Sequence, residues 1–343
     1  MTTQVEYRQL GKTGLRVSVP VMGAMTFGSA AWGGPWILEE EKAFELLKAA
    51  WDKGINTIDT ANMYSNGASE RIVGNFVKKY QIPRNEIIIA TKCCNLVGKT
   101  PGLHAYTQPH LKAQRDYVNQ SGLSRAAIFN AVEASLERLQ TSYIDLLQIH
   151  RYDTDTDPEE TMKALHDLVQ TGKVRYLGAS SMRTWQFAML NEIADKRGWT
   201  KFVSMQNEYS LLYREDEREM LAYCKYNGIG IIPWSPLAAG ALARPLGTQT
   251  TRTQLTKGTP LEPKYTKADE VVIDRVKELA EKHRKKMSQV ALAWVSSKIT
   301  SPIVGANSVT RLEECLTKGF ELTADEVKYL EEPYVPKAVR GHA

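Results

Sequence analysis

The sequence predicts an α/β fold, and within that class a (β/α)8 TIM barrel. The chain has 343 residues, a length that fits two average domains or one barrel of the kind that typically runs ~250 residues or more. Short apolar runs alternate with longer amphipathic stretches, as a parallel sheet covered by helices requires. Eight strand–helix units follow one another without interruption, which favours a closed barrel over a doubly wound sheet. We therefore expect a single domain over residues 1–343.

The elements follow from these patterns in chain order. Residues 157–160 (Asp-Pro-Glu-Glu) combine an N-cap, a proline at the first helical position and two acids in the first turn. Gly54 and Gly228 each follow a helix, where a left-handed residue is commonly needed. The expected strands cover residues 20–25, 55–59, 86–91, 144–149, 174–179, 202–206, 229–234 and 299–304. The expected helices cover 39–52, 69–80, 124–139, 158–170, 184–196, 215–227, 268–286 and 310–317, with an additional one over 324–332.

Three segments stand outside this repeat. Residues 7–10 and 15–18 flank Gly-Lys-Thr-Gly at 11–14, which predicts an N-terminal hairpin that caps one mouth of the barrel. Two long loops, 95–122 after the third strand and 238–266 after the seventh, leave the C-terminal ends of their strands. Loops of this length without periodicity are usually lids or disordered, and because barrel enzymes keep their sites at that face, we expect these two to act as lids.

Composition and charge exclude several classes of function. The chain carries 44 Lys and Arg against 39 Asp and Glu, and because these charges are scattered rather than gathered in a basic stripe, we expect no nucleic-acid partner. The short basic run at 283–286 is expected on a solvated helix face. No window reaches the ~18 apolar residues of a membrane span, so no membrane partner is expected. The start MTTQVEYRQL lacks the apolar core of a signal peptide, which predicts a cytoplasmic location.

The cysteines and histidines form no metal-binding pattern. The chain has four cysteines and six histidines, and they contain neither a CxxC nor an HExxH motif. We therefore expect no metal site and no disulfide framework.

Four polar residues lie at or just beyond the ends of three consecutive strands. Asp59 ends the second expected strand and Tyr64 lies in the loop that follows, while Lys92 and His150 follow the third and fourth strands. If the barrel closes, all four side chains point toward one mouth. Taken singly, each has an ordinary structural explanation, as a cap, a surface ion pair or a hydrogen-bonded support. Together at matching strand ends they indicate an active site.

This set of residues is suited to a tuned proton donor. Tyrosine has an ordinary pKa of about 10, so it is a poor acid at neutral pH. A nearby ammonium lowers that pKa, and a carboxylate holds the ammonium in place. We expect Tyr64, Lys92 and Asp59 to form the donor and His150 to orient a carbonyl oxygen.

Seven segments of the chain carry a resemblance to a known family. They are DTANMYSNGASE (59–70), ATK (90–92), DLLQIHRYD (145–153), GKVRYLGASS (172–181), MQNEY (205–209), PWSPLAAGAL (233–242) and IVGANSVTRLEE (303–314). Together they resemble the aldo-keto reductase superfamily over nearly the whole chain, and most closely its fungal aryl-alcohol dehydrogenase-like and toxin-pathway branch. The resemblance implies a nicotinamide-dependent carbonyl reductase in which Tyr64 is the general acid, Lys92 and Asp59 tune it, and His150 positions the substrate.

The same resemblance implies which residues bind NADP(H). Ser180, Ser181 and Gln206 match the residues that hold the nicotinamide carboxamide, although the second is usually Asn. Trp234 stands where many members have a tyrosine stacked on the nicotinamide, and an indole offers an equally flat face, with core packing as the alternative. No GxGxxG occurs, so a Rossmann crevice is not expected. The loop that matches the pyrophosphate clasp contains Ser235, Pro236, Leu237, Gly240 and Arg244.

The region that matches the 2′-phosphate site departs from part of the family. Gly305 stands where some branches have a lysine, and Cys315 stands where an adenine-binding asparagine is frequent. Arg311 remains as a phosphate ligand, since its planar guanidinium suits phosphate, and the preference is for NADPH over NADH. The matching residues are Gly305, Asn307, Ser308, Arg311 and Glu314.

We expect the chain to reduce aldehydes or ketones to alcohols with NADPH, as a monomer or weak homo-oligomer whose partner is a small-molecule carbonyl substrate. An alternative is a nucleotide-binding regulatory subunit that resembles the potassium-channel β subunits. A third reading is a Schiff-base aldolase that uses Lys92, which would leave the nicotinamide residues unexplained. The candidate aromatic walls, which are equally well explained as packing residues, are Trp32, Trp36, Tyr106 and Tyr152.

Overall fold

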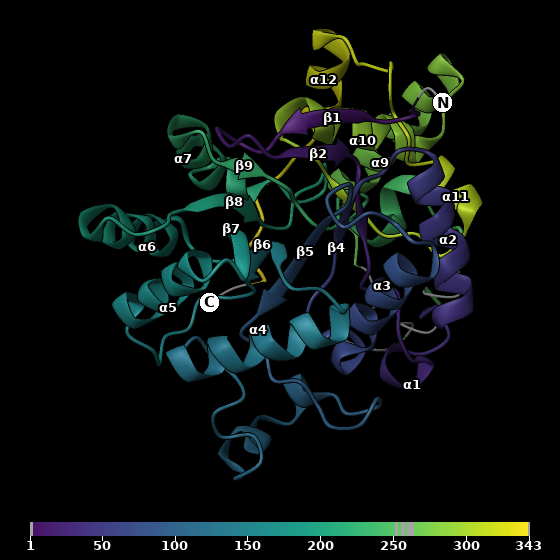
Figure 1. Ribbon diagram of the computed structural model, residues 1–343. Coiled ribbons are helices and arrows are strands. Elements are labelled where there is room, and N and C mark those ends of the chain that lie inside the picture. Colours follow the sequence, from purple (N-terminus) through teal and green to yellow (C-terminus); the bar gives the residue numbers. More distant parts are fainter. Residues whose placement is uncertain (1–2, 251–252, 255–257, 259–263, 342–343) are drawn as a thin grey trace.

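Eight parallel strands surround the centre of the molecule in the computed structural model, which describes residues 3–250, 253–254, 258 and 264–341. They pair in the order β10-β3-β4-β5-β6-β7-β8-β9. Backbone hydrogen bonds join the two ends of this order, from Thr300 N to the Ile231 oxygen and from Ile303 N to the Pro233 oxygen, both at 2.9 Å. The sheet is therefore a closed (β/α)8 barrel, and the predicted fold class is confirmed (Figure 1). The strands are β3 Val21–Gly23, β4 Thr57–Asp59, β5 Ile88–Cys93, β6 Ile144–Ile149, β7 Val174–Ser180, β8 Phe202–Gln206, β9 Gly230–Ile231 and β10 Ile303–Val304.

Helices cover the outside of the barrel. The α5 helix begins as the sequence predicts, because the Asp157 carboxylate accepts a hydrogen bond from Glu159 N at 2.8 Å and Pro158 follows at the first position. In the described part of the chain, no helix has the length and apolar character that a membrane crossing requires. The helices are α1 Ala30–Gly33, α2 Glu40–Asp52, α3 Ala68–Lys79, α4 Arg125–Leu139, α5 Pro158–Gln170, α6 Thr184–Arg197, α7 Met220–Asn227, α9 Lys267–His283, α10 Met287–Lys298, α11 Val309–Glu313 and α12 Ala324–Glu331.

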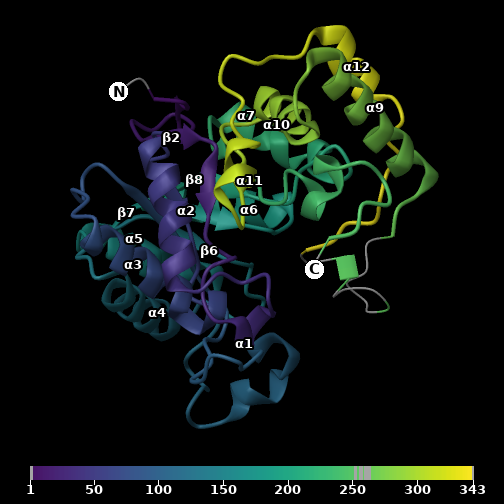
Figure 2. The same cartoon turned by 90° about the vertical axis from the view of Figure 1, so that its right-hand side faces the viewer.

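A two-stranded antiparallel hairpin closes one end of the barrel. It consists of β1 Glu6–Gln9 and β2 Arg16–Val19. Leu10 and Val17 of the hairpin pack with Val21 and Ile88, the first residues of β3 and β5, so the hairpin covers the N-terminal ends of the strands. Figures 1 and 2 show residues 95–122 projecting from the opposite end. The C-terminal strand ends are therefore left to the long loops.

Residues 95–122, called the insertion from here on, form a small folded unit between β5 and α4. The insertion contains the short helical turns η2 Ala105–Thr107 and η3 Pro109–Ala113. Leu96, Leu111 and Tyr117 make a buried cluster inside it. The second long loop, 238–266, begins with the helical turn η5 Ala238–Ala243, and its residues 251–252, 255–257 and 259–263 lie outside the described residues.

Among the described residues, two helices are absent from the sequence prediction, the short α1 and the longer α10. The expected helix over 268–286 is in fact α9, which ends at His283, and Arg284 then takes a left-handed φ of 53° before α10 begins. Nine of the twelve residues of α10 are buried, so this helix lacks the polar face by which amphipathic periodicity is detected. The basic run 283–286 consequently lies at the break between two helices rather than along a helix face.

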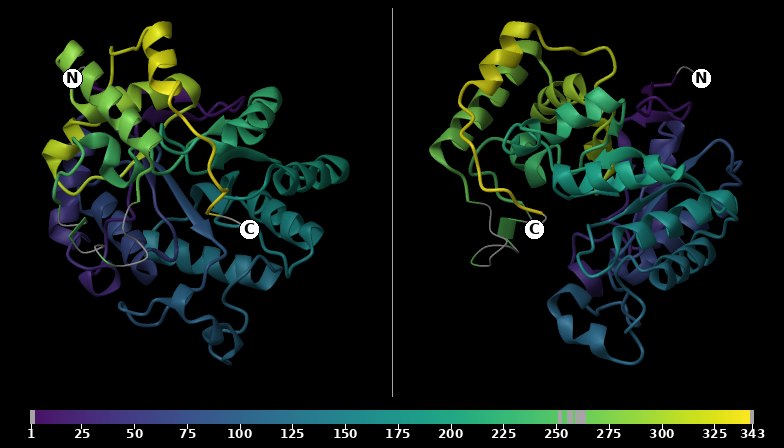
Figure 3. Two further views of the ribbon diagram at one scale, coloured as in Figure 1. Left: turned by 180° about the vertical axis from the view of Figure 1, so that it is seen from behind. Right: turned by 90° about the vertical axis from the view of Figure 1, so that its left-hand side faces the viewer.

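The predicted helix over 215–227 is also divided, into a turn η4 Glu215–Glu217 and α7. The C-terminal segment, which runs from α12 along the outside of the barrel, contacts η4 (Figure 3). In η4 the Glu215 carboxylate accepts hydrogen bonds from Tyr334 Oη at 2.6 Å and from Lys337 N at 2.7 Å. These contacts attach η4 to the C-terminal segment.

Candidate active site

The four predicted catalytic residues meet at the C-terminal ends of three neighbouring strands. Asp59 is the last residue of β4, Lys92 lies one residue before the end of β5, and His150 directly follows β6. Tyr64 opens η1 Tyr64–Gly67, the turn that follows β4. Because β4 pairs with β5 and β5 with β6, the parallel register brings these residues to one mouth of the barrel.

A buried ion pair forms the base of this site. Lys92 Nζ donates a hydrogen bond to Asp59 Oδ1 at 2.5 Å and another to the Thr60 backbone oxygen at 2.8 Å. The side chains of Lys92 and Asp59 are 0% and 3% exposed. Separating the two side chains would leave a buried charge without a partner, which is strongly destabilising. Each residue therefore holds the other in place.

Tyr64 and His150 lie above this ion pair. The Tyr64 hydroxyl accepts a hydrogen bond from Lys92 Nζ at 3.4 Å. The rings of Tyr64 and His150 meet edge to face, with centroids 5.9 Å apart and planes at 82°. The Nδ1 atom of His150 is buried and has no hydrogen-bond partner among the described residues. The site therefore presents a phenol and an imidazole side by side over a buried ammonium.

Burial and charge determine the protonation states of these groups. Burial raises the pKa of Tyr64 above its ordinary value, and the Lys92 ammonium only partly offsets that rise. Burial lowers the pKa of Lys92, but Asp59 and Tyr64 outweigh it, so the net pKa is raised. Burial, assisted by Lys92 and Arg151, holds the pKa of His150 well below its ordinary value. At neutral pH the phenol is protonated, the lysine charged and the imidazole neutral.

The pKa shifts of Tyr64 and Lys92 test two expectations from the sequence. The expectation that Lys92 lowers the pKa of Tyr64 is right for its own contribution, but burial reverses the net shift. A raised pKa also keeps Lys92 charged, whereas a Schiff-base lysine must be available as the neutral amine. The aldolase alternative therefore has no support from this geometry.

Asp59 has further partners that sequence reasoning missed. Gln148 Nε2 and Gln206 Nε2 each donate to Asp59 Oδ2 at 2.9 Å, and Gln206 Nε2 also donates to Gln148 Oε1 at 2.8 Å. Gln148 lies two residues before His150 on β6, and alternation along a strand would have placed it on the same face. Because the side-chain N–H groups of Gln206 donate to Asp59 and Gln148, the side-chain oxygen Oε1 of Gln206 is the atom left for a ligand.

A second buried ion pair supports the turn that carries Tyr64. Arg138 Nε donates to Glu70 Oε2 at 2.7 Å, and Thr91 Oγ1 donates to Glu70 Oε1 at 2.6 Å. Gly67 makes room for this arginine, because a Cβ there would lie 2.5 Å from Arg138 Cδ. The Glu70 carboxylate thus joins α3, α4 and β5 directly behind η1.

The residues predicted to hold a nicotinamide lie at the ends of β7, β8 and β9. Ser180 Oγ donates to the Gln206 backbone oxygen at 2.7 Å, and Ser181 N donates to Asn207 Oδ1 at 2.7 Å. Trp234 Nε1 donates to Ser181 Oγ at 3.2 Å. The indole is half-buried, so it is fixed by a polar contact while part of its surface is exposed. These features suit a stacking platform better than a core residue.

The loop after β9 has an unusual backbone. Ser235, Ala238, Ala239 and Gly240 have φ angles of 56°, 48°, 57° and 100°. Residues other than glycine seldom adopt this left-handed region, and such strain is concentrated at functional sites and ligand clamps. The same loop carries Pro236, Leu237 and Arg244, and its backbone could enclose a pyrophosphate.

The predicted 2′-phosphate residues surround the start of α11. Ser308 caps α11 by accepting a hydrogen bond from Arg311 N at 3.3 Å, and both side chains are exposed. The neighbouring acids are occupied elsewhere, since Glu313 pairs with Lys53 at 2.8 Å and Glu314 lies 3.7 Å from Lys286. The Arg311 guanidinium is therefore accessible to an anion. Gly305 and Asn307, also exposed, lie just before this turn.

The candidate aromatic residues lie on segments that follow the C-terminal ends of β3, β5 and β6. Trp32 stacks on His104 of the insertion, with ring centroids 6.0 Å apart. Tyr152 meets Trp185 edge to face at 6.3 Å, and Trp185, which sequence reasoning missed, is 58% exposed. Trp36 is half-buried, and the side chain of Tyr106 lies outside the described residues.

The C-terminal segment reaches this mouth as well, which the sequence did not indicate. Arg340 donates to both carboxylate oxygens of Glu208, at 2.6 Å and 3.0 Å. Glu208 forms an isolated parallel bridge with Trp234 beyond the ends of β8 and β9, and a Cβ on Gly341 would lie 3.6 Å from the Trp234 ring. The segment therefore borders the indole predicted to face the nicotinamide.

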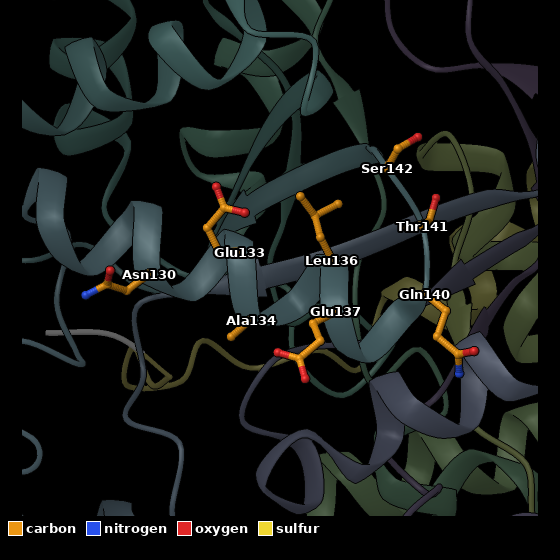
Figure 4. Close-up of a pocket in the computed structure, with 8 residues that line it drawn as sticks. All are labelled: Asn130, Glu133, Ala134, Leu136, Glu137, Gln140, Thr141 and Ser142. Atoms are coloured by element: carbon orange, nitrogen blue, oxygen red, sulfur yellow. The ribbon is translucent and has the colours of Figure 1, made fainter.

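A separate surface depression lies on the outer side of α4 (Figure 4). None of the predicted site residues belongs to it, so it plays no part in the site described above. In the residues that the structure describes, no group of three or more His, Cys, Asp or Glu side chains could hold a metal ion. The depression is lined by Asn130, Glu133, Ala134, Leu136, Glu137, Gln140, Thr141 and Ser142.

Comparison with known proteins gives consistent matches over nearly the full length. The family model described as "Aldo/keto reductase family" matches residues 21–334. An aldo-keto reductase of Fusarium vanettenii is 52% identical, covering 99% of this chain and 94% of the relative. A versiconal hemiacetal acetate reductase of Aspergillus parasiticus is 48% identical, with 98% of each chain covered. A putative aryl-alcohol dehydrogenase of Saccharomyces cerevisiae is 44% identical, covering 98% of this chain and 99% of the relative.

Proposed function

Because this chain belongs to the aldo/keto reductase family and is an oxidoreductase, we propose that it reduces aldehydes or ketones to alcohols with NADPH. The family match confirms the resemblance seen in the sequence. The observation that carries the proposal is the Tyr64 hydroxyl at 3.4 Å from a charged lysine that is itself fixed by a buried carboxylate.

The side chains divide the work of protonating a carbonyl oxygen. Tyr64 holds the proton, since burial keeps its pKa high, and transfers it from its hydroxyl to the oxygen as the alcohol forms. Lys92 stabilises the phenolate left behind, because its ammonium already lies at the hydroxyl oxygen. His150 is neutral and its ring lies beside Tyr64, so it orients the carbonyl oxygen by a hydrogen bond.

Asp59 acts through Lys92. Its carboxylate holds the ammonium at 2.5 Å, and the two glutamine amides that donate to its other oxygen hold the carboxylate in turn. The reaction therefore depends on a preorganised network in which Tyr64 alone gives up a proton.

The cofactor that suits the site is NADPH, which supplies the hydride when it is bound. Ser180, Ser181 and the side-chain oxygen Oε1 of Gln206 would hold the nicotinamide carboxamide, and the half-buried indole of Trp234 would stack on the nicotinamide ring. The proposed pyrophosphate ligands are Ser235, Pro236, Leu237, Gly240 and Arg244, and the proposed 2′-phosphate and adenosine ligands are Gly305, Asn307, Ser308, Arg311 and Glu314.

Aromatic aldehydes and ketones are the proposed substrates. The support is the position of Trp32 and Tyr152 in segments after the C-terminal ends of β3 and β6, together with relatives named as aryl-alcohol dehydrogenases. We propose that the protein acts as a monomer or weak homo-oligomer in the cytoplasm. All four cysteines are free, and thiols persist in a reducing compartment.

The test is a rate assay with NADPH and with NADH over a panel of aromatic and aliphatic aldehydes and ketones. We expect oxidation of NADPH that depends on the carbonyl compound and is fastest with aromatic aldehydes. Tight NADPH binding without turnover of any carbonyl compound would instead support the regulatory-subunit alternative.

A further inference from the structure

The three residues after Tyr64 all adopt left-handed backbone. Ser65, Asn66 and Gly67 have φ angles of 47°, 51° and 89°. Glycine tolerates this region freely and asparagine better than most residues, whereas serine does not. A run of three such residues therefore persists only where surrounding contacts enforce it. The contacts of Ser65 and Asn66 show what enforces it here.

The Asn66 side chain binds the backbone of the insertion through both ends of its amide. Its Oδ1 accepts a hydrogen bond from Gly98 N at 2.8 Å. Its Nδ2 donates to the backbone oxygens of Thr100 at 2.9 Å, Pro101 at 3.2 Å and Leu103 at 2.9 Å. One side chain thus holds four backbone groups of the segment that begins the insertion.

Gly98 leaves the space that the contact between Asn66 and the insertion requires. A Cβ on Gly98 would lie 3.0 Å from Asn66 Nδ2 and 2.8 Å from the Leu103 side chain. Only glycine lets the backbone come this close to the Asn66 amide. The close approach of η1 and the insertion therefore depends on Asn66 in the one and Gly98 in the other.

Ser65 makes the matching contact on the other side, toward α1. Ser65 Oγ accepts a hydrogen bond from Ser29 N at 3.3 Å, and a Cβ on Gly28 would lie 2.0 Å from that same oxygen. The insertion also meets α1 directly, through the stacked rings of Trp32 and His104. Figure 2 shows α1 next to the insertion at the catalytic end of the barrel.

These contacts join the loops after three successive strands, β3, β4 and β5, at the two residues that follow Tyr64. We propose that Asn66 is a positioning residue, which fixes the insertion relative to Tyr64 and thereby shapes the mouth through which the carbonyl substrate reaches the tyrosine. This inference rests on the proposed reductase function. Within the described residues, the Asn66 side chain makes its hydrogen bonds to the insertion and none to a catalytic side chain, so its loss should change substrate binding and leave proton transfer intact.

The test uses Asn66→Gly and Asn66→Asp in the full-length protein. Glycine keeps the left-handed backbone and removes every side-chain hydrogen bond. Aspartate keeps the shape and the acceptor for Gly98 N but turns an oxygen toward three backbone oxygens. Gln81→Gly is the matched control, because Gln81 also has a φ of 51° and its exposed side chain lies at the end of α3, away from the catalytic face.

We expect both Asn66 variants to raise KM for benzaldehyde by about tenfold, since each hydrogen bond contributes about a two- to twelvefold change in an equilibrium constant. The kcat, its pH profile and the Kd for NADPH should stay within about twofold of the unmodified protein. Amide hydrogen exchange in residues 98–103 should become faster in both variants and stay unchanged in the Gln81 control.

Unchanged exchange in residues 98–103 of both Asn66 variants would overturn the inference, as would faster exchange with an unaltered KM. A loss of kcat equal to the rise in KM would overturn it too, because Asn66 would then support the tyrosine itself. The exchange measurement needs no turnover. If the unmodified protein reduces no carbonyl compound, the proposed function fails while the exchange result still reports on the Asn66 contact.

Discussion

At the residue scale, the surrounding side chains control the protonation state of Tyr64. Burial raises the pKa of this phenol, while Lys92 provides the charge that its phenolate would need. A general acid is active only in its protonated form. Raising its pKa therefore moves the loss of activity to higher pH, and we expect reduction to be nearly constant between about pH 6 and pH 9.

Tyr64→Phe keeps the ring and removes the proton. General acid catalysis contributes ~10²–10⁴-fold, so kcat for carbonyl reduction should fall by about that factor. The Kd for NADPH, measured by quenching of tryptophan fluorescence, should remain nearly unchanged because Tyr64 is not among the proposed cofactor ligands. Turnover close to that of the unmodified protein would show that another group supplies the proton.

We predict that the exposed guanidinium of Arg311 determines the preference for NADPH over NADH. A hydrogen bond to a charged group contributes ~1.5–3 kcal/mol, or about ten- to a hundredfold in affinity. Arg311→Ala should weaken NADPH binding by about that factor and leave NADH binding nearly unchanged, as titration calorimetry can measure. Lys318→Ala, which removes an exposed cation beyond α11, is the control. Equal losses for both cofactors would mean that Arg311 has only a structural role.

At the scale of elements, Glu326 attaches α12 to α9. Burial alone would raise the pKa of this carboxyl, but hydrogen bonds from Lys282, Thr323 N and His283 outweigh it and hold the pKa at about 2. The carboxylate is thus bound in the folded state and free in the unfolded one. Since the folded pKa is depressed, its stabilising contribution is complete above the unfolded value of 4.5 and disappears as pH falls toward 2.

We therefore predict that Glu326→Gln lowers Tm at pH 7, and that the difference from the unmodified protein shrinks as pH falls from about 5 to 3. Thermal unfolding followed by circular dichroism at several pH values measures both quantities. Glu270→Gln, an exposed position in the first turn of α9, should show little change at any pH. A constant difference in Tm across this range would argue against the charge as the source of the effect.

At the scale of the whole molecule, the barrel has no free edge between β9 and β10. The backbone hydrogen bonds that close it and the continuous core between strands and helices make each strand depend on both neighbours. We predict that the chain unfolds as one cooperative unit over its full length, which is what a single domain requires. Calorimetric and van't Hoff enthalpies should agree, whereas two separated transitions would contradict the single-domain prediction.

The sequence by itself determined the barrel and placed the four catalytic candidates on it. The strands are short apolar runs, helices such as α3 and α5 have one buried apolar face and one polar face, and a residue at a strand end must lie at the mouth once the barrel closes. These are local properties, and they can be counted along the chain. Asp59, Tyr64, Lys92 and His150 follow from them because each is tied to the end of a recognisable strand.

Only the tertiary structure decided the contacts between distant segments. The buried helix α10 has no polar face to detect, and the hydrogen bond from Gln206 to Asp59 joins residues 147 positions apart. The hydrogen bonds of Asn66 to the insertion likewise depend on how the loops after β4 and β5 pack against each other. Hydrogen bonds between separate loops are set by packing and close approach, which leave no period in the sequence.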